Sequence, residues 1–269
     1  MTDKYAVIGN PIAHSKSPQI HAAFAKQTNQ QMSYEAILAP LDGFRTSLQA
    51  NIYAGYRGVN VTVPFKFEAF AMCDTLSARA QSAGAANTLS FESGEIQGDN
   101  TDGVGLVNDI KNNLKHALEG ARILVLGAGG AAQGVLLPLL NTKPASIIIA
   151  NRTLAKAQKM VEKSGNVAIT SANSFESLQG QFDVIINATS TGLSDTTLPI
   201  PNSIFAKNCL AYEMMYGLET PFMAQARKNG AQVSDGLGML VEQAAEAFYI
   251  WRGVRPQTAP VIAMLRSAN

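Results

Sequence analysis

A glycine-rich segment follows directly after a short apolar run near the middle of the chain. Residues 122–126 read Arg-Ile-Leu-Val-Leu, and residues 127–132 read Gly-Ala-Gly-Gly-Ala-Ala. In this spacing Gly127 permits a tight turn, Gly129 lets the backbone approach a pyrophosphate, and Ala132 allows a helix to pack closely on the strand. The free N–H groups at the start of such a helix face the phosphates. A strand pattern precedes the glycines and a helical one follows, which favours a dinucleotide site over an ordinary strand–helix turn.

The end of the next predicted strand indicates which dinucleotide is bound. An NAD-binding protein usually has Asp or Glu at this strand end, about 20 residues after the glycines, to hold the ribose 2′-hydroxyl. This chain has Asn151, Arg152 and Thr153 there instead. A carboxylate would repel a 2′-phosphate, whereas Arg152 can pair with it and stack on the adenine. Taken alone, Arg152 could equally be a solvated residue that opens a helix. Together with the glycine segment it predicts NADP. Residues 187–192, Asn-Ala-Thr-Ser-Thr-Gly, add small polar groups at a third strand end.

Four polar clusters in the first 103 residues are further candidates for ligand binding. They occupy residues 9–18, 60–66, 84–88 and 99–103. Ser15 and Ser17 precede a predicted helix and could bind a carboxylate, although Ser17 could instead simply cap that helix. Alternation places Asn60 and Thr62 on one face of a strand, and Lys66 follows, either as a functional group or as a surface lysine. Each cluster lies at a strand end or a helix start, where ligands gather in open α/β sheets.

The elements that must position these residues alternate between strand and helix. In the first half we expect strands at residues 5–8, 34–38, 59–63 and 88–91, with helices at 18–26 and 44–53. A helix at 104–118 should lead to strands at 122–126, 146–150, 183–187 and 209–212, with helices at 154–163 and 221–228 between them. This spacing predicts βαβ units and a parallel sheet. Closing helices at 238–251 and 258–265 could pack back on the first half, which would make the second domain an insertion.

The bulk properties exclude several classes of protein. The chain has 269 residues, 46% of them hydrophobic and 15% charged, with a net charge of +1. Nucleic acid or an anionic membrane as the main partner would require a concentrated basic surface. We find no signal peptide and no run of about 18 apolar residues, and Cys73 and Cys209 are distant, as expected of reduced thiols. A cytoplasmic protein is expected.

The histidines are scattered, so no metal site is predicted, and His14 is read as a loop-ordering residue rather than a catalytic acid.

The motifs, in order, are GNPIAHSKSP, NVTVPFK, GAANT, GDNTDGVG, the GAGGAA/NRT pair and DGLGMLVEQAA at residues 235–245. Together they resemble the shikimate dehydrogenase family over essentially the whole chain. The resemblance implies an α/β fold of two domains: residues 1–101 plus 237–269 bind substrate, and residues 102–236 form a Rossmann-like NADP domain. It also implies NADP-dependent, reversible reduction of 3-dehydroshikimate to shikimate, a step of chorismate and aromatic amino-acid biosynthesis, by a monomer or homodimer.

The same resemblance assigns roles to individual residues. Lys66 and Asp102 would be the catalytic pair. The substrate carboxylate would be held by Ser15 and Ser17, and its ring and hydroxyls by Asn60, Thr62, Asn87, Tyr216 and Gln243. The cofactor would be held by Gly127, Ala128, Gly129, Gly130, Ala131, Asn151, Arg152, Thr153, Thr189, Met214 and Gly236. One segment departs from the family pattern, which commonly has Tyr-Asp-Met where this chain has Tyr212-Glu213-Met214.

A Lys–Asp pair suits the oxidation of a secondary alcohol, in which a proton leaves the oxygen as a hydride leaves the carbon. Lys66 can donate that proton in the reducing direction and accept it in the other. A free lysine titrates near about 10.4, so its action as a base requires assistance, and which residue moves the proton stays open. Two alternatives remain: a relative that also takes quinate or NAD, and a non-catalytic metabolite sensor. The sensor should have lost the Lys–Asp pair or the glycine loop, and this chain keeps both.

Overall fold

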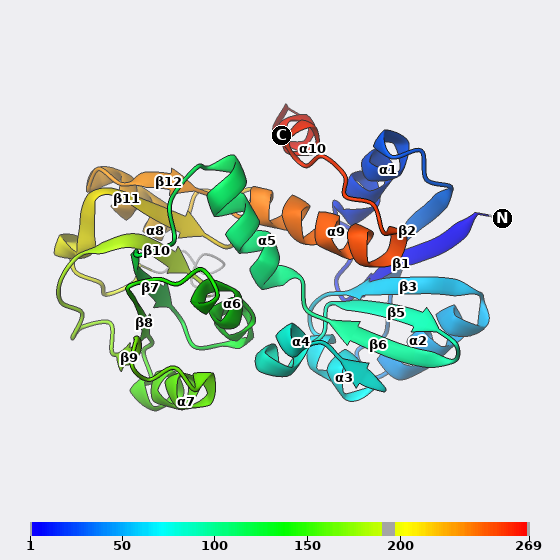
Figure 1. Ribbon diagram of the computed structural model, residues 1–269, viewed down its shortest axis with the longest axis horizontal. Helices are drawn as coiled ribbons and strands as arrows, with labels where there is room; N and C mark the ends of the chain where they lie inside the picture. Colours follow the sequence, from blue (N-terminus) through cyan, green and yellow to red (C-terminus); the bar gives the residue numbers. More distant parts are fainter. Residues whose placement is uncertain (1, 190–196, 268–269) are drawn as a thin grey trace. The chain divides into compact units, whose positions relative to one another are not determined.

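The structure is a computed structural model, and it describes residues 2–189 and 197–267. The chain forms two compact units, residues 1–105 with 240–269 and residues 106–239. The first unit is therefore interrupted in sequence by the second. Figure 1 shows the elements of both units. Among the described residues, no helix is long and apolar enough to cross a membrane.

The first unit is built on a mixed sheet in the order β2-β1-β3-β5-β6-β4. Its strands are β1 (Asp3–Gly9), β2 (Met32–Leu38), β3 (Tyr56–Val61), β4 (Thr75–Leu76), β5 (Thr88–Glu92) and β6 (Glu95–Asp99). Its helices are α1 (Ser17–Gln27), α2 (Phe44–Tyr53), α3 (Lys66–Ala71), α4 (Ala78–Ala83), most of α9 (Leu237–Arg252) and α10 (Ala259–Ser267). β1 pairs in parallel with β2 and β3, whereas β5 is antiparallel to β3 and β6.

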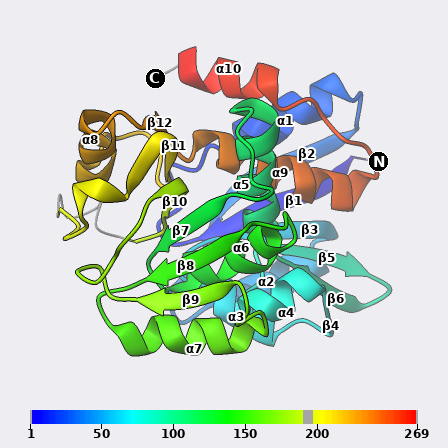
Figure 2. The same cartoon turned by 60° about the vertical axis from the view of Figure 1, so that its left-hand side comes forward.

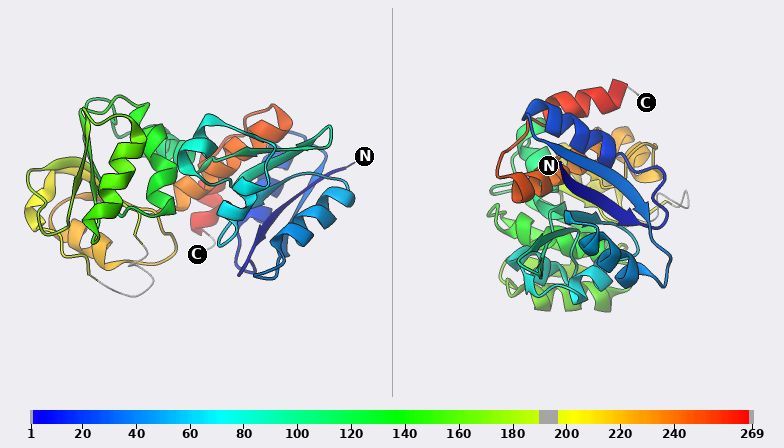
Figure 3. Two further views of the ribbon diagram at one scale, coloured as in Figure 1. Left: turned by 90° about the horizontal axis from the view of Figure 1, so that it is seen from below. Right: turned by 90° about the vertical axis from the view of Figure 1, so that its right-hand side faces the viewer.

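Alternation along β1 supplies both faces of this sheet with apolar side chains. Ala6 and Ile8 pack with Phe44 of α2 in one buried cluster. On the other face, Tyr5 stacks on Trp251 of α9, with ring centroids 4.7 Å apart. α2 and α9 therefore cover opposite faces of the sheet (Figures 1 and 3). The sheet is fixed from both sides, and this gives its strand ends a rigid base.

Gly58 of β3 lies against Trp251 of α9 with no room for a side chain. A Cβ at this position would lie 2.5 Å from both the carbonyl oxygen of Leu89 and Nε1 of Trp251, which are themselves joined by a hydrogen bond of 3.1 Å. We expect Gly58→Ala to lower the free energy of unfolding by about 2–3 kcal/mol through overpacking and loss of that bond. Trp251 is the only tryptophan, so its fluorescence in a urea titration measures the effect. A change below about 0.5 kcal/mol, the level of a neutral surface substitution, would contradict this packing.

The second unit contains a parallel sheet in the order β12-β11-β10-β7-β8-β9. The strands are β7 (Arg122–Leu126), β8 (Ser146–Ala150), β9 (Thr170–Asn173), β10 (Phe182–Asn187), β11 (Phe205–Glu213) and β12 (Gln232–Ser234). The connecting helices are α6 (Gly130–Leu140), α7 (Leu154–Ser164) and α8 (Pro221–Lys228), with a 3-10 turn at Asn202–Ile204. Figure 2 shows α7 beside β9 and α8 beside β11 and β12.

This strand order is the one found in dinucleotide-binding sheets, with the order reversing at the first strand of the unit. The reversal lies here between β7 and β10. Buried side chains alternate between two clusters along β7: Ile123 and Val125 pack on one side, and Leu124 and Leu126 on the other. The fold class predicted from the sequence, an α/β protein with a Rossmann-like second domain, is therefore confirmed.

Several predicted element boundaries differ from the structure. β11 begins at Phe205, not at residue 209. The helix expected at 104–118 is α5 (Asp102–Asn108) followed by a π-helical turn, Asp109–Asn113. Asp109, the first residue of this turn, accepts a hydrogen bond from the hydroxyl of Tyr212 at 2.6 Å, and Lys115 follows the turn with a positive φ. β3 ends at Val61, not at residue 63. α1 begins at Ser17 with Lys16 as the N-cap residue, so Ser17 does not cap a helix that starts at Pro18.

Candidate active site

Three of the four polar clusters, at residues 60–66, 84–88 and 99–103, converge where β3, β5 and β6 lie side by side. Asn60 of β3 is paired in register with Thr88 of β5, and Thr88 is paired with Asp99 of β6. Asn87 and Thr101 lie next to these strand ends in sequence. Segments from residues 60, 87 and 101 are thereby brought to one place by backbone pairing, and this grouping was predicted only as a tendency of strand ends.

Lys66 and Asp102 meet directly. Lys66 is the first residue of α3 and Asp102 the first residue of α5. The Lys66 Nζ donates to Asp102 Oδ2 at 2.5 Å. The side chains are 27% and 19% exposed, so the pair is sheltered yet open to a ligand. An ammonium and a carboxylate in this contact can bind a hydroxyl and exchange a proton with it.

Asn87 holds the other oxygen of Asp102. Its Nδ2 donates to Asp102 Oδ1 at 2.7 Å, and its Oδ1 accepts from the backbone N–H of Thr101 at 2.9 Å. The side chain is only 2% exposed. Both carboxylate oxygens of Asp102 are thus engaged, one by Asn87 and one by Lys66. This fixes the direction in which the Lys66 ammonium approaches a ligand.

Asn60 is committed to the frame of the site. Its Nδ2 donates to the carbonyl oxygen of Asn87 at 3.1 Å and to Thr88 Oγ1 at 3.0 Å. Its Oδ1 accepts from the hydroxyl of Tyr34 at 2.7 Å. Both amide hydrogens are used inside the protein, so only Oδ1 has capacity left for a ligand. Tyr34 was not among the predicted residues, because a tyrosine in the middle of a strand carries no sequence signal for this contact.

The other predicted substrate residues occupy separate positions. Ser15 Oγ accepts from the backbone N–H of Ser17 at 3.3 Å, so the two serines share one turn. Thr62 follows β3 and is half-buried. Gln243 of α9 accepts from Thr101 Oγ1 at 3.3 Å, which ties it to the Asn87 cluster. Tyr216 belongs to the second unit and is not placed against these residues, and His14 is exposed.

An ion-pair network supports the segment that carries Asp102. Arg79 donates to Asp99 Oδ2 at 2.6 Å and to Glu246 Oε1 at 3.0 Å, and Ser77 Oγ donates to Asp99 Oδ1 at 2.5 Å. Burial alone would raise the pKa of Asp99, but the hydrogen bonds from Arg79 and Ser77 outweigh it and bring the pKa below the usual value. Sequence reasoning missed Arg79, because nothing in the sequence marks its partners.

Asp99 makes the stability of this unit depend on pH. A carboxyl group whose pKa is lowered by folding stabilises above its unfolded pKa, and that contribution is lost as the pH falls through the folded pKa. We expect Asp99→Asn to lower the free energy of unfolding by about 2 kcal/mol near neutral pH. The gap between the two proteins should shrink below about pH 4, as followed by Trp251 fluorescence in urea. A gap that stays constant down to pH 3 would contradict the lowered pKa.

The second unit presents a surface suited to a dinucleotide at the carboxyl ends of its strands. Gly127 has φ +107°, a conformation that L side chains rarely adopt, and a Cβ there would lie 3.1 Å from the carbonyl oxygen of Ala188 at the end of β10. A Cβ on Gly129 would meet nothing within 4 Å. Gly129 is the N-cap of α6 and offers no capping side chain. Open space before uncapped N–H groups fits a pyrophosphate.

Arg152 lies one strand away, after β8. It is exposed, and no ion pair of Arg152 occurs within residues 2–189 and 197–267. Its neighbour Asn151 donates from Nδ2 to the carbonyl oxygen of Thr153 at 2.9 Å, which closes a turn around the arginine. A guanidinium presented in this way can pair with a phosphate.

Thr189, Met214 and Gly236 follow three adjacent strands, β10, β11 and β12. The Met214 N–H donates to the carbonyl oxygen of Asn187 at 3.1 Å. A Cβ on Gly236 would lie 2.2 Å from the carbonyl oxygen of Met214, so this approach requires glycine. The remaining part of the predicted segment, Ser190 to Gly192, lies outside the described residues.

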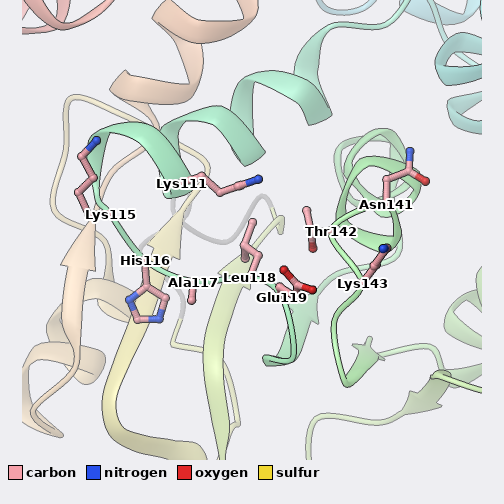
Figure 4. Close-up of a pocket in the computed structure, with 9 residues that line it drawn as sticks. All are labelled: Lys111, Lys115, His116, Ala117, Leu118, Glu119, Asn141, Thr142 and Lys143. Carbon is pink, nitrogen blue, oxygen red and sulfur yellow. The ribbon is translucent and has the colours of Figure 1, made fainter.

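A separate hollow of about 520 Å³ lies at the amino-terminal edge of the same sheet, before β7 and β8. Among the residues that line it are Lys111, Lys115 and Lys143, with Glu119 and His116 between them (Figure 4). None of the predicted site residues lines this hollow. It therefore belongs to neither the glycine loop nor the Lys–Asp pair. Among the described residues, no group of three His, Cys, Asp or Glu side chains could hold a metal ion.

The glycine loop on a sheet of this order, with a separate Lys–Asp pair on a second α/β unit, defines a two-domain nucleotide-binding α/β protein. Three family models match the chain: the shikimate dehydrogenase substrate binding domain at residues 7–89, shikimate / quinate 5-dehydrogenase at 109–196, and the shikimate 5′-dehydrogenase C-terminal domain at 236–266. The chain belongs to the shikimate dehydrogenase family.

Individual relatives match over nearly their full length. The chain is 60% identical to the shikimate dehydrogenase (NADP(+)) of Methylobacillus flagellatus, over 99% of this chain and 100% of the relative. It is 58% identical to that of Janthinobacterium sp., over 98% and 97%. Among solved structures, the Thermus thermophilus shikimate 5-dehydrogenase in complex with NADP(H) and shikimate is 34% identical with a TM-score of 0.89, covering 100% of both chains. An Ael1 enzyme from Pseudomonas putida is 47% identical with a TM-score of 0.95, covering 98% of both.

Proposed function

We propose that this protein is an NADP-dependent dehydrogenase that interconverts shikimate and 3-dehydroshikimate. The observation that carries the proposal is the hydrogen-bonded pair of Lys66 and Asp102, oriented by Asn87. Relatives named shikimate dehydrogenase (NADP(+)) support the choice of substrate and cofactor. In this proposal residues 1–101 and 237–269 bind the substrate, and residues 102–236 bind NADP. A cytoplasmic location, a monomer or homodimer, and no nucleic-acid partner remain predictions.

The substrate carboxylate would be bound by the hydroxyls of Ser15 and Ser17. The ring hydroxyls would be bound by Thr62, Asn87 and Gln243, with Asn60 contributing through Oδ1 and Tyr216 as a further contact. Asn87 and Thr101 are joined to Asp102 and Gln243 by hydrogen bonds, so a ligand would meet preset groups. Preset groups lose little conformational entropy when a ligand binds.

NADP, held by the residues of the second unit, would supply the acceptor for the hydride that leaves the carbon bearing the hydroxyl when the reaction runs toward the ketone. Lys66 as the neutral amine would take the hydroxyl proton in that direction and become the ammonium, which would return the proton in the other. The Lys66 ammonium would also stabilise negative charge that develops on the oxygen during reduction. Asp102 would bind the same hydroxyl and hold Lys66 in position. We assign the proton to Lys66 and an orienting role to Asp102, whose two oxygens accept hydrogen bonds from Asn87 and Lys66.

The cofactor would be held along one edge of the second sheet. Gly127, Ala128, Gly129, Gly130 and Ala131 would bind the pyrophosphate, and Asn151, Arg152 and Thr153 the phosphorylated ribose. Thr189, Met214 and Gly236 would bind the nicotinamide end. The open space at Gly129 and the absence of an ion pair for Arg152 within the described part of the chain support this assignment.

The test is the initial rate of cofactor reduction, measured by absorbance, with each of shikimate and quinate combined with each of NADP and NAD. We expect turnover with shikimate and NADP to exceed the other three combinations. Equal rates with quinate would favour a broader enzyme, which the family description shikimate / quinate 5-dehydrogenase keeps open. A Listeria monocytogenes relative was solved with shikimate and NAD, so NAD is a necessary comparison. No turnover despite tight cofactor binding would favour a metabolite sensor.

A further inference from the structure

The last residue of β11 is a buried carboxylate that the reaction itself does not use. Glu213 is 0% exposed, and no ion pair of Glu213 occurs among the described residues. A carboxylate is costly to bury unless hydrogen bonds replace its water. Burial raises the pKa of Glu213, and hydrogen bonds from Met215, Asn187 and Thr220 oppose that rise. The free-energy cost of burying this carboxylate indicates that Glu213 has a role in positioning other groups.

Its three partners come from three different segments. Asn187 Nδ2, at the end of β10, donates to Glu213 Oε2 at 2.6 Å. Thr220 Oγ1, the N-cap of α8, donates to the same oxygen at 2.9 Å. The backbone N–H of Met215 donates to Oε1 at 3.1 Å. Glu213 therefore joins the end of β10, the loop after β11 and the start of α8.

Asn187 passes this constraint to Thr189. Because its Nδ2 is held by Glu213, its Oδ1 must point away, where it accepts from the backbone N–H of Thr189 at 3.1 Å and from Thr189 Oγ1 at 2.7 Å. If the acceptor at Glu213 were lost, the amide of Asn187 could turn over. It would then present a donor to the N–H of Thr189, and both bonds would break.

Glu213 also fixes the loop after β11, and through it Gly236. Met215, whose N–H is held by Glu213, accepts from the N–H of Gly236 through its carbonyl oxygen at 2.8 Å. Met214 lies between the two anchored residues and donates its N–H to the carbonyl oxygen of Asn187 at 3.1 Å. The residues proposed for the nicotinamide end are thus all bonded to partners of Glu213 or adjacent to it in sequence.

We propose that Glu213 is the positioning residue of the nicotinamide subsite: it sets Thr189, Met214 and Gly236 without touching the cofactor. The proposal deepens the proposed function and rests on its assignment of the cofactor edge. Glu213 is also where the chain departs from the Tyr-Asp-Met pattern of its family. Aspartate keeps the charge and both acceptor oxygens on a shorter side chain, so we expect it to fill the same role.

Two probes separate this role from a general structural one. NADP⁺ occupies both ends of the proposed site, whereas adenosine 2′,5′-bisphosphate carries only the end assigned to Arg152. Their dissociation constants can be measured by calorimetry without substrate or turnover. Glu213→Gln keeps the shape but places an amide donor against the donors of Met215, Asn187 or Thr220. We expect it to weaken NADP⁺ binding about tenfold, as for a lost hydrogen bond to a charged group, and to leave the bisphosphate within about twofold.

Further variants give the comparison its controls. Glu213→Asp is expected to bind NADP⁺ within about threefold of the parent, because a carboxylate still accepts from Asn187. Glu219→Gln changes an exposed glutamate six positions along the chain and should change neither constant. If Glu213→Gln does not fold, Asn187→Ala removes the relay while Glu213 remains, and the same selective loss is expected.

Equal weakening of both probes by Glu213→Gln, or no weakening of either, would overturn the proposal. Equal losses in Glu213→Gln and Glu213→Asp would also overturn it, because the carboxylate would then not be the requirement. Failure of the parent protein to bind either ligand is a different result. It would remove the assignment of the cofactor edge, and with it the proposed function on which this inference rests.

Discussion

Lys66→Met is expected to lower kcat for shikimate oxidation by roughly a thousandfold, within the range for loss of a general acid–base group. The substitution removes the ammonium that meets Asp102 at 2.5 Å and leaves a side chain of similar length. Asp102 keeps its bond from Asn87, so the site should hold its shape. The measurement is steady-state turnover with saturating NADP and shikimate, together with calorimetric binding of NADP⁺, which should stay within about twofold of the parent.

The matched control for this substitution is Lys26→Met. Lys26 is an exposed lysine in the last turn of α1, in the same unit. It should keep full turnover. The loss of a general acid–base group lowers the rate by at least about a hundredfold. If Lys66→Met retains more than about a tenth of the parent kcat, Lys66 is structural and the assigned proton transfer is wrong.

Arg152→Ala should lower kcat/KM for NADP by about 30- to 100-fold and leave the value for NAD nearly unchanged. A charged hydrogen bond contributes about 1.5–3 kcal/mol, and because Arg152 is exposed we expect a loss equivalent to about one such bond to the phosphate. NAD has no 2′-phosphate, so the same change removes little from its binding. The preference for NADP over NAD, measured as the ratio of the two kcat/KM values with shikimate, should therefore collapse.

Arg45→Ala provides the comparison, because Arg45 is an exposed arginine of α2 in the other unit. Its cofactor preference should match that of the parent. Parallel losses with NADP and NAD in Arg152→Ala would show that the arginine contributes to the site in general, and would remove the argument for 2′-phosphate recognition.

The sequence predicted best where a local pattern determines a local structure. The glycine spacing at Gly127 and Gly129 requires a turn and a close approach, and the structure has φ +107° at the first and open space at the second. Period-2 and helical patterns located most strands and helices within a few residues. The helix at 104–118 was wrong: α5 gives way to a π-helical turn at Asp109, which is bonded to Tyr212, 103 residues away, a contact that no local pattern shows.

The contacts that could not be predicted from the sequence join residues that are far apart in the chain. Arg79 and Glu246 are 167 residues apart and carry no shared motif. Tyr34 of β2 meets Asn60 of β3 because both strands pair with β1, which places the two residues in one sheet on either side of that strand. Likewise, Glu213 stood out as a departure from a family pattern, but its reach to Asn187 and Thr220 depends on how β10, β11 and α8 are arranged. The roles of the site residues themselves stay proposals that the variants above test.

The most direct test of the central claim is to follow the hydrogen that the reaction moves. Shikimate carrying deuterium on the carbon that bears the oxidised hydroxyl is incubated with the protein and NADP⁺, and the reduced cofactor is analysed by mass spectrometry. We predict one deuterium in the reduced cofactor and a ketone product that has lost it, with the amount transferred by Lys66→Met at matched time lower by roughly a thousandfold. Unlabelled reduced cofactor, or no reduced cofactor from a protein that binds NADP⁺ tightly, would contradict the account.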